Sequence, residues 1–393
     1  MQIIMKFSRL ARFGLGEGDV QRKIQPSKAS RPKLNRPGNT IRIGFIPVTD
    51  CVPLLAAQRL DLFAKNDLNV SLHCEVGWAS IREKLIHGQL DATQAVAGMA
   101  VALPLGLQGS PVRVITPFIF SLQGNAITLS RSLWNKGVRD ASSLKKLIRS
   151  QPDQMLTFGV VSLFAAHNFM LRRWLQLGGI DPDRDVRMLA FPPGLMAENL
   201  KDGLLDGFCA GEPWGSQAVA SGTGWCPAIS EDLLPRHPEK VLIMQERLHA
   251  EYSHQVQALC SALAEACAYC EAKENRPTLV KWLVECGHFD VNANVFSRSL
   301  IGPFDDGMGR MRDAASFHIF ARRDSNQATA ERATWVVNEC SHHGLLPGRV
   351  RSDAQSELSR SWTDRIPLNR PSASRISRKP RSFSLQKAST RTS

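Results

Sequence analysis

The chain has 393 residues, of which 43% are hydrophobic, and it carries a formal net charge of +13 at pH 7. This composition excludes a wholly disordered protein, and the length allows two domains of ordinary size, each with its own core. No stretch of the sequence approaches the ~20 continuous apolar residues that a membrane span needs, so we predict no transmembrane segment.

The positive charge belongs to the two ends of the chain. Residues 1–40 hold nine Lys/Arg against two Asp/Glu, and residues 348–393 hold eleven against three, which leaves the middle close to −2. Both ends are rich in Ser, Pro, Lys and Arg and poor in large apolar side chains, so we expect disordered basic tails. Such tails are either solvated without a partner or bound weakly, in a salt-dependent way, to an acidic surface, RNA or lipid headgroups. The nearly neutral middle predicts a core that makes no direct contact with nucleic acid.

Nine cysteines are scattered along the chain, and this odd number favours a reducing compartment over a disulfide framework. Residues 1–18 contain no uninterrupted apolar run of the kind that a signal peptide needs. We therefore expect a cytoplasmic location, with a periplasmic or membrane-associated one as the alternative if a leader was missed. Cys267 and Cys270 form a C-x-x-C pair within a helical run, where a core-facing role is favoured over metal or redox chemistry.

The predicted elements alternate between strands and helices. Thr49 and Asp50 are the expected caps of the first helix. The predicted strands are 41–47, 70–76, 92–99, 112–118, 126–129, 156–161, 186–191, 207–210, 227–229 and 241–244. The predicted helices include 51–64, 80–87 and 164–177, and after residue 244 the chain is expected to be mainly helical to about residue 344. This alternation predicts the α/β class, with mostly parallel sheets covered on both faces.

One short phrase occurs twice, 115 residues apart, at 81–92 and at 196–207. In each copy apolar residues recur at helical spacing, and Gly88 or Gly203 then supplies the left-handed conformation that ends a helix. We infer two similar lobes, in which matching helix amino ends surround a cleft that favours an anion. The alternative is that the phrase is a common helix-to-strand connector.

The order of the strands predicts two lobes joined by two crossings of the chain. One lobe comprises residues 41–125 together with 228–347, and the other comprises residues 126–227. Paired crossings form a hinge, and a ligand that touches both lobes favours the closed state.

Three side chains are candidates for binding a small anion in such a cleft. Trp78 stands just before the first repeated helix, where its indole N–H and the free main-chain N–H groups of the first turn would form a donor-rich pocket. His167 could donate to an anion or instead satisfy a backbone carbonyl. Lys240 is either a surface lysine or an ammonium in the cleft, where a unit charge pair at ~4 Å and an effective dielectric near 20 is worth about 4 kcal/mol.

Other features of the sequence limit the chemistry. Glu212, just after the second repeat, is expected to fix a helix start or to pair with a basic side chain rather than to bind an anion. The sequence contains no P-loop, dinucleotide fingerprint, His-Glu-x-x-His motif or nucleophile elbow. We therefore predict no catalytic residue, no metal site and no cofactor.

Residues 41–345 resemble the nitrate-binding proteins related to bacterial nitrate and bicarbonate ABC transporters. The phrases that carry the resemblance occur in order at 44–54, 78–80, 124–130, 167–172, 178–185, 207–214 and 237–241. The resemblance implies a two-lobed fold of the periplasmic-binding-protein type (type II), in agreement with the internal repeat.

The resemblance also implies the site residues. Trp78, the main-chain N–H near Ser80, His167 and Lys240 would contact the anion, and Asn125 stands where an amide side chain is expected. The implied ligand is nitrate or nitrite, and the sequence does not separate these from bicarbonate. On this basis Lys240→Ala is expected to abolish anion binding and to leave the fold intact.

Three functions remain open at the level of the sequence. Because no export signal or lipid-attachment cysteine is visible, the chain is most similar to the cytoplasmic nitrate/nitrite sensor of nitrate-assimilation operons, whose members hold an RNA-binding antiterminator protein. We therefore expect a sensor that regulates nitrate assimilation through a protein partner. The alternative is the substrate-binding component of a nitrate or bicarbonate ABC transporter. A third reading, an enzyme similar to the pyrimidine-precursor synthases, is disfavoured by the scattered cysteines.

Overall fold

The structure, a computed structural model, describes residues 40–313, 316–346, 348, 355, 356, 358, 361 and 362. One group of strands comprises β1 (Ile41–Phe45), β2 (Val70–Cys74), β3 (Ala92–Val96), β4 (Val114–Gln123), β10 (Pro238–Gln245) and β13 (His318–Ile319). A second group comprises β5 (Asn125–Ser130), β6 (Thr157–Val160), β7 (Arg187–Ala190), β8 (Gly207–Gly211) and β9 (Gly224–Ile229). A hairpin is formed by β11 (Phe304–Asp305) and β12 (Met311–Arg312).

Helices cover both groups of strands. They are α1 (Val52–Arg59), α2 (Leu62–Lys65), α3 (Trp78–Ile86), α4 (Met99–Ala102), α5 (Arg131–Asn135), α6 (Ala141–Ser150), α7 (Ala166–Leu177), α8 (Met196–Lys201), α9 (Trp214–Ala220), α10 (Ser230–Leu233), α11 (Glu246–Glu271), α12 (Arg276–Glu285), α13 (Ala293–Leu300) and α14 (Ala330–His342). Short 3-10 turns are η1 (Thr49–Cys51), η2 (Pro193–Leu195) and η3 (Lys273–Asn275).

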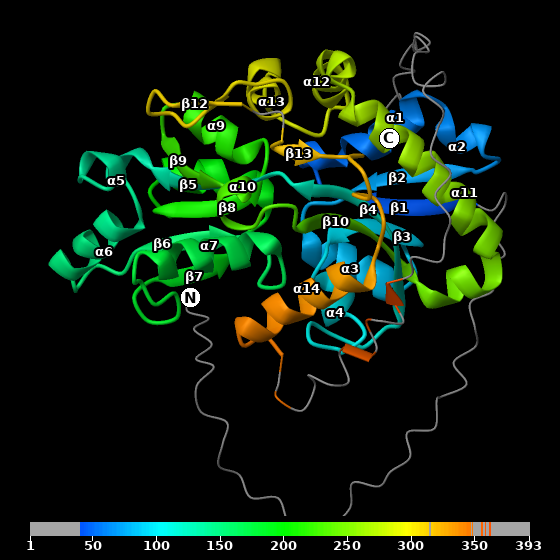
Figure 1. Cartoon of the computed structure of the whole chain (residues 1–393), viewed down its shortest axis with the longest axis horizontal. Helices are drawn as coiled ribbons and strands as arrows, with labels where there is room; N and C mark the ends of the chain where they lie inside the picture. Colours follow the sequence, from blue (N-terminus) through cyan, green and yellow to red (C-terminus); the bar gives the residue numbers. More distant parts are fainter. Residues whose placement is uncertain are drawn as a thin grey trace, which may run out of the picture. The chain divides into compact units, whose positions relative to one another are not determined.

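The strands form two separate sheets that lie side by side (Figure 1). The first sheet has the order β13-β4-β10-β3-β1-β2, and the second has the order β7-β6-β8-β5-β9. The chain passes from the first sheet to the second at Gly124, between β4 and β5, and returns through α10 between β9 and β10. This arrangement is the predicted α/β architecture, whereas the lobe boundaries drawn from the sequence stay a prediction.

The strands that follow these two passages run antiparallel to their neighbours. In the first sheet β10 is antiparallel to β3 and β4, and in the second β5 is antiparallel to β8 and β9. The pairs of β1 with β2 and β3, and of β6 with β7 and β8, are parallel. The prediction of mostly parallel pairing is therefore wrong at β5 and β10, because these strands arrive from the other sheet and not through a helical crossover.

Successive residues of β10 supply two different cores. Val241 and Ile243 belong to the larger hydrophobic cluster, which includes residues of α3 and α4. Leu242 and Met244 belong to a second cluster, which includes residues of α1 and α11. This alternation follows the two-residue period of a strand, and burial on both faces explains why the sequence there is continuously apolar.

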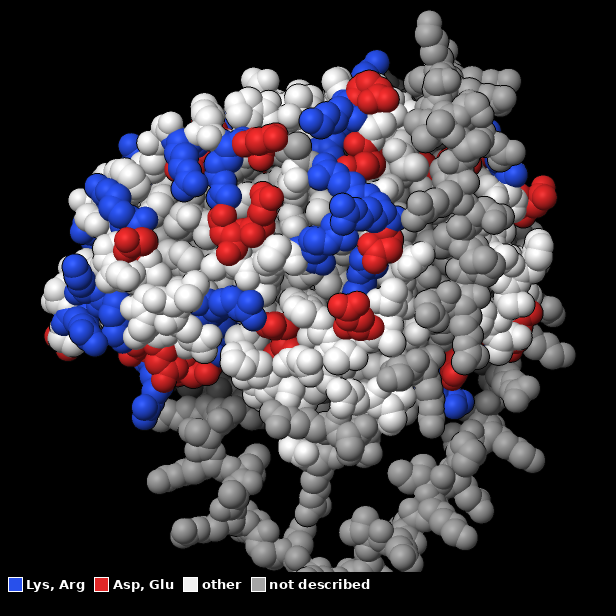
Figure 2. Space-filling view, viewed as in Figure 1, with Lys and Arg blue, Asp and Glu red and all other residues white. Residues whose placement is uncertain are grey.

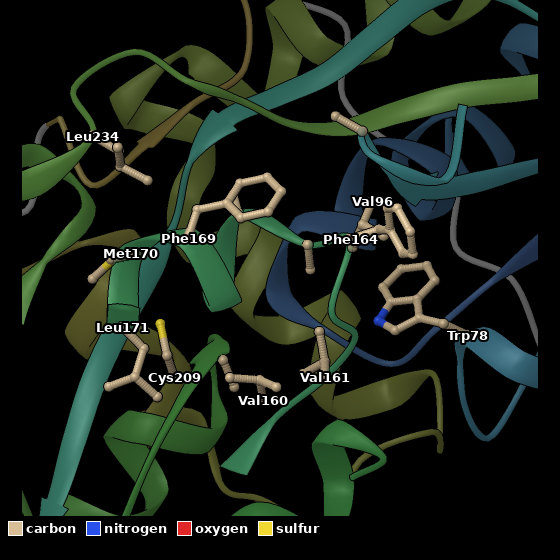
Figure 3. Packing of buried hydrophobic residues seen from close by; sticks show 14 of the residues in the cluster. Trp78, Val96, Val160, Val161, Phe164, Phe169, Met170, Leu171, Cys209 and Leu234 are labelled. Carbon is tan, nitrogen blue, oxygen red and sulfur yellow. The ribbon is translucent and has the colours of Figure 1, made fainter. Parts of the chain in front are cut away.

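The larger hydrophobic cluster continues from one sheet to the other. Trp78 and Val96 contribute to it from the first sheet and its helices, and Val161, Phe164 and Phe169 contribute from the second. Figure 3 shows these side chains around a shared interior, with Phe164 close to Trp78 and Val96. The two sheets are therefore packed against each other in this structure, with apolar side chains as the contact.

The first passage between the sheets requires a glycine. Gln123 and Gly124 have φ angles of 64° and 97°, in the left-handed region. A Cβ at Gly124 would lie 2.5 Å from Nδ1 of His318, which is closer than real Cβ contacts allow. Glycine provides both the backbone conformation and the space for the neighbouring ring.

Two helices between residues 130 and 155 are missing from the sequence prediction. The start of α6 nevertheless carries a local signal, because Asp140 Oδ1 accepts from the Ser143 N–H at 2.7 Å and Ser143 Oγ accepts from the Asp140 N–H at 3.0 Å. Such a reciprocal cap satisfies two main-chain donors at a helix start.

The predicted N-terminal tail, apart from Thr40, lies outside the described residues. A few residues of the predicted C-terminal tail are described, and for them the prediction of disorder is wrong. Leu358 and Trp362 are each 3% exposed and belong to the larger hydrophobic cluster, and Trp362 forms a β-bridge with Thr116 of β4. The large apolar area of the tryptophan ring explains why this short segment packs.

All nine cysteines are described, and all are free. Cys267 and Cys270 are fully buried in α11, so the predicted core-facing role is confirmed. Burial raises the pKa of both thiols, which keeps them protonated. Within the described ranges, no helix is long and apolar enough to cross a membrane, and no group of three or more His, Cys, Asp or Glu side chains is placed to hold a metal ion.

Acidic and basic side chains are interspersed on the face shown in Figure 2. Ion pairs among the described residues include Arg312 with Asp232 at 2.6 Å and Arg298 with Asp305 at 2.9 Å. The mixture agrees with the nearly neutral charge of the middle of the chain.

A substitution in the central strand of the second sheet tests this core. Phe208 lies on β8 and is fully buried, so Phe208→Ala should lower the free energy of unfolding by about 3–5 kcal/mol in urea denaturation. The matched control is Leu177→Ala, which removes a side chain that is 71% exposed and should change stability by less than about 0.5 kcal/mol. Equal effects of the two substitutions would contradict the assigned core.

Candidate functional site

The structure brings Trp78, Asn125, His167 and Lys240 into one buried cluster. Trp78 is 5% exposed, His167 is 1% exposed, and Asn125 and Lys240 are fully buried. They come from both sheets: Trp78 begins α3 and Lys240 lies on β10, while Asn125 begins β5 and His167 lies in the first turn of α7. The predicted residues are thus placed where the two sheets meet.

Ser80 differs from the other predicted residues because its side chain is only half-buried. Its hydroxyl donates to the Gly77 carbonyl at 2.9 Å, within the first turn of α3. Gly77 is the N-cap residue and has no side chain with which to cap the helix. The first-turn N–H groups of α3 therefore lack a side-chain cap, as the sequence analysis assumed for the main chain near Ser80.

The ammonium of Lys240 lies between two buried carboxylates. Its Nζ is 2.5 Å from Glu239 Oε1 and 3.0 Å from Asp50 Oδ2, and both acidic side chains are at most 1% exposed. The same Nζ lies 5.7 Å from the centre of the Trp78 ring. The ammonium has three N–H donors: one donates to Glu239 Oε1, and the Asp50 contact is an ion pair without hydrogen-bond geometry.

Mutual charge pairing sets the ionisation of this group. Burial opposes the charged form of Lys240, but Asp50 and Glu239 outweigh it and raise the pKa of the ammonium above its ordinary value. Burial would also raise the pKa of Glu239, but Lys240 and the neighbouring His167 outweigh it and hold that pKa well below the usual range. For Asp50 burial is the larger effect, so the pKa of that carboxyl is raised.

Glu239 is the side chain that connects the cluster across the two sheets. Its Oε2 accepts from Asn125 Nδ2 at 2.7 Å and lies 3.1 Å from His237 Nε2, and its Oε1 lies 3.4 Å from His167 Nε2. A regular strand would send Glu239 and Lys240 to opposite faces. Here the pairing of β10 with β4 shifts register on both sides of Lys240, and this irregularity re-aims the side chains so that they meet.

Sequence reasoning missed Asp50 and Glu239 as members of the site. Asp50 was expected to cap a helix, but it makes no such contact, and its carboxylate pairs with Lys240. The available signal was the position of Lys240 at the start of an apolar strand, since a lysine buried there needs a counter-charge. The partner itself, far away in the sequence, follows only from the fold.

His167 has both ring nitrogens unsatisfied, because neither makes a hydrogen bond to any described residue. Burial lowers the pKa of its imidazole to about 3, so the ring is neutral at pH 7 and carries one N–H. The alternative in which His167 satisfies a backbone carbonyl is not observed. The indole Nε1 of Trp78 is likewise buried without a hydrogen-bond partner among the described residues.

Gly211, at the end of β8, faces this cluster and was not predicted. A Cβ at this position would lie 3.7 Å from both Asn125 Oδ1 and His167 Nε2. Because glycine has no side chain, these two polar atoms face the main chain of β8. Both atoms lack a hydrogen-bond partner among the described residues, and a side chain larger than that of glycine at position 211 would reduce the space beside them.

Residues next to the cluster join the two sheets directly. The Thr49 N–H, after β1, donates to the Glu212 carbonyl, after β8, at 2.6 Å. The Glu212 carboxylate accepts from the Ser216 N–H at 3.0 Å, so its predicted role at a helix start is confirmed at α9. Burial raises the pKa of Glu212 from 4.5 to about 7.

Two sheets joined by two passages of the chain, with a buried polar cluster where they meet, define the fold of the periplasmic binding proteins. The chain belongs to the NMT1-like family, whose model matches residues 35–284. The two-lobed fold expected from the sequence is thereby confirmed, as is the resemblance to the nitrate-binding proteins.

Two curated relatives and one solved structure illustrate this relationship. The chain is 36% identical over 307 residues to the nitrate import ATP-binding protein NrtC of Synechocystis sp., covering 77% of this chain and 46% of that protein. It is 29% identical over 293 residues to the bicarbonate-binding protein CmpA of Synechococcus elongatus, covering 72% and 65%. The crystal structure of the periplasmic nitrate-binding protein NrtA from Synechocystis superposes with a TM-score of 0.78 at 23% identity, covering 84% and 87%. The chain thus spans about half the length of NrtC.

The raised pKa of Glu212 predicts a pH dependence of stability. Because the folded state holds this proton more tightly than the unfolded state, the contribution is complete below pH 4.5 and is lost as the pH rises through about 7. Urea denaturation should show that the wild type loses roughly 3 kcal/mol across this interval that Glu212→Gln does not lose. Parallel pH profiles of the two proteins would show that Glu212 titrates normally.

The two carboxylates around Lys240 change the expectation for its removal. Lys240→Ala leaves Asp50 and Glu239 buried without their cation, so the free energy of unfolding should fall by about 3–5 kcal/mol. This expectation replaces the one drawn from the sequence, that the substitution leaves the fold intact. Lys281→Ala is the control, because that side chain is 71% exposed and pairs with Glu285 only at 3.7 Å. Thermal denaturation measures both, and an unchanged midpoint for Lys240→Ala would argue against the ion-pair cluster.

Proposed function

We propose that this chain binds a small oxyanion, nitrate or bicarbonate, where its two sheets meet, and that it acts as a binding component of an ABC import system. The observation that carries the proposal is the fully buried ammonium of Lys240 beside the unsatisfied ring nitrogens of Trp78 and His167. An ammonium, an indole N–H and an imidazole offer hydrogen-bond donors in a low-dielectric environment, where they bind an anion more strongly than in water. The site residues predicted from the sequence are part of this proposal.

The size of the ligand limits its affinity. Nitrate and bicarbonate each have four non-hydrogen atoms, and the best small ligands gain about 1.5 kcal/mol per atom. The resulting ~6 kcal/mol corresponds to a dissociation constant of roughly tens of micromolar. A site of this kind needs the charge, the hydrogen bonds and the burial together.

The names of the relatives favour transport over the sensor function that the sequence suggested first. They include a nitrate import protein and a bicarbonate-binding protein, and none of those described above is a transcriptional regulator. An antiterminator partner has no support in these relationships. The structural neighbour is a periplasmic protein, which favours the periplasmic alternative for location, and cell fractionation tests it.

The described conformation supports a binding cycle in which the two lobes close around the ligand. The Thr49 N–H to Glu212 carbonyl contact joins the sheets beside the proposed site. Gly98, after β3, packs so closely against the second sheet that a Cβ there would lie 1.9 Å from the Phe164 carbonyl oxygen. A ligand held by residues of both sheets stabilises this closed arrangement through its differential affinity.

Gly98→Ala tests both binding and closure. Gly98 has φ −68°, which alanine adopts freely, so the only cost is the collision with Phe164 when the sheets approach. Calorimetric titration of the full chain with sodium nitrate and sodium bicarbonate should show affinity for at least one anion in the wild type and at least tenfold weaker binding in Gly98→Ala.

The control for this experiment is Gly194→Ala, whose Cβ would make only ordinary contacts at 3.6 Å to the Trp214 ring and should leave affinity unchanged. A wild type that binds none of the oxyanions nitrate, nitrite and bicarbonate would overturn the proposed function. A Gly98→Ala variant with unchanged affinity would remove closure from the mechanism while leaving binding in place.

A further inference from the structure

The Glu239 carboxylate holds the Asn125 side chain in one orientation. Its inward amide atom lies 2.7 Å from Glu239 Oε2 and 3.2 Å from His237 Nε2. An ionised carboxylate only accepts, so the atom that faces Glu239 must be the NH₂ group. The choice between the nitrogen and the oxygen of this amide therefore rests on the chemistry of its partners.

His237 contacts the same carboxylate. Its Nδ1 lies 2.6 Å from the Leu234 carbonyl oxygen, and its Nε2 lies 3.1 Å from Glu239 Oε2. The orientation of the Asn125 amide therefore follows from Glu239, and the amide oxygen Oδ1 points away from this carboxylate.

Asn125 Oδ1 consequently faces the proposed ligand position. It is buried and has no hydrogen-bond donor among the described residues, and it lies 3.7 Å from the Cβ position of Gly211, as does His167 Nε2. A buried oxygen without a donor is unfavourable. A ligand that donates a hydrogen bond to Oδ1 removes this cost, whereas a ligand that presents another lone pair is repelled.

The side chains around this position act in the same direction. Asp50 and Glu239 place four carboxyl oxygens beside the single ammonium of Lys240, and His167 is neutral. These carboxyl oxygens and Asn125 Oδ1 are hydrogen-bond acceptors, so the cluster favours a ligand that can donate a hydrogen bond. The ligand that fits best is therefore one that brings its own hydrogen-bond donor.

Nitrate and bicarbonate are a matched pair for this distinction. Both are planar, both have one negative charge, and both have four non-hydrogen atoms, but only bicarbonate has an O–H group. We infer that Asn125, positioned by Glu239, makes the site selective for an oxyanion that carries its own O–H group, and hence for bicarbonate over nitrate. This inference rests on the proposed function, since it names which member of the ligand class the same site selects.

The wild-type chain provides the first test. Calorimetric titration with sodium bicarbonate and sodium nitrate, at one ionic strength and at pH 8, should show at least tenfold tighter binding of bicarbonate. Nitrate binding as tight as bicarbonate binding, or tighter, overturns the inference and leaves the proposed function standing. Absence of binding by both anions overturns the proposed function itself.

Glu239→Gln tests the origin of the selectivity. A glutamine can donate as well as accept, so the Asn125 amide is free to turn and to present its NH₂ group to the ligand. The ratio of nitrate to bicarbonate affinity should rise at least tenfold. Loss of the negative charge at 239 affects two monoanions alike, so it cancels in this ratio.

Two further variants complete the experiment. Glu339→Gln removes another mostly buried carboxylate, one that pairs with Arg173 at 2.9 Å, and it should leave the ratio unchanged. Asn125→Leu has a similar volume without the amide oxygen, so bicarbonate should lose its advantage, and this variant replaces Glu239→Gln if the latter does not fold by circular dichroism. An unchanged ratio in a folded variant at either position 125 or 239 contradicts the assigned role of Asn125.

Discussion

The charge pairing of Lys240 with Asp50 and Glu239 is the interaction on which the site depends. A lysine buried without counter-charges would be too costly, and removing the lysine would leave two buried carboxyl groups without their cation. Glu239 extends this pairing to Asn125 at the start of β5 and to His167 in α7, so the electrostatic cluster belongs to both sheets at once. The same contacts that neutralise the lysine therefore position the atoms that face the proposed ligand position.

Local patterns in the sequence were sufficient for much of the fold. The repeated phrases correspond to α3 followed by β3 and to α8 followed by β8, and Gly88 and Gly203 have the expected positive φ angles of 67° and 74°. Helix ends and apolar periodicity are determined within a few residues, so the sequence predicts them well. The direction of β5 and β10 does not follow from such local patterns, because it depends on which sheet the chain has just left.

The site was predictable to the extent that its residues stand beside recognisable phrases. Trp78, Asn125, His167 and Lys240 meet as expected, but the roles of Asp50, Glu239 and Gly211 depend on contacts between distant segments and on the irregular pairing of β10 with β4. A strand pattern would place Glu239 on the face opposite Lys240, so the period itself argued against the contact that forms. The orientation of the Asn125 amide likewise needs its partners in space.

The bridge between Trp362 and Thr116 has a practical meaning for work on this chain. The family match stops at residue 284, yet Leu358 and Trp362 share a core with α14 and with the first sheet. A fragment trimmed to the matched region would bare the apolar surface that these residues cover, and exposed apolar surface promotes aggregation. Recombinant versions should accordingly retain the chain through Trp362, although the family match ends at residue 284.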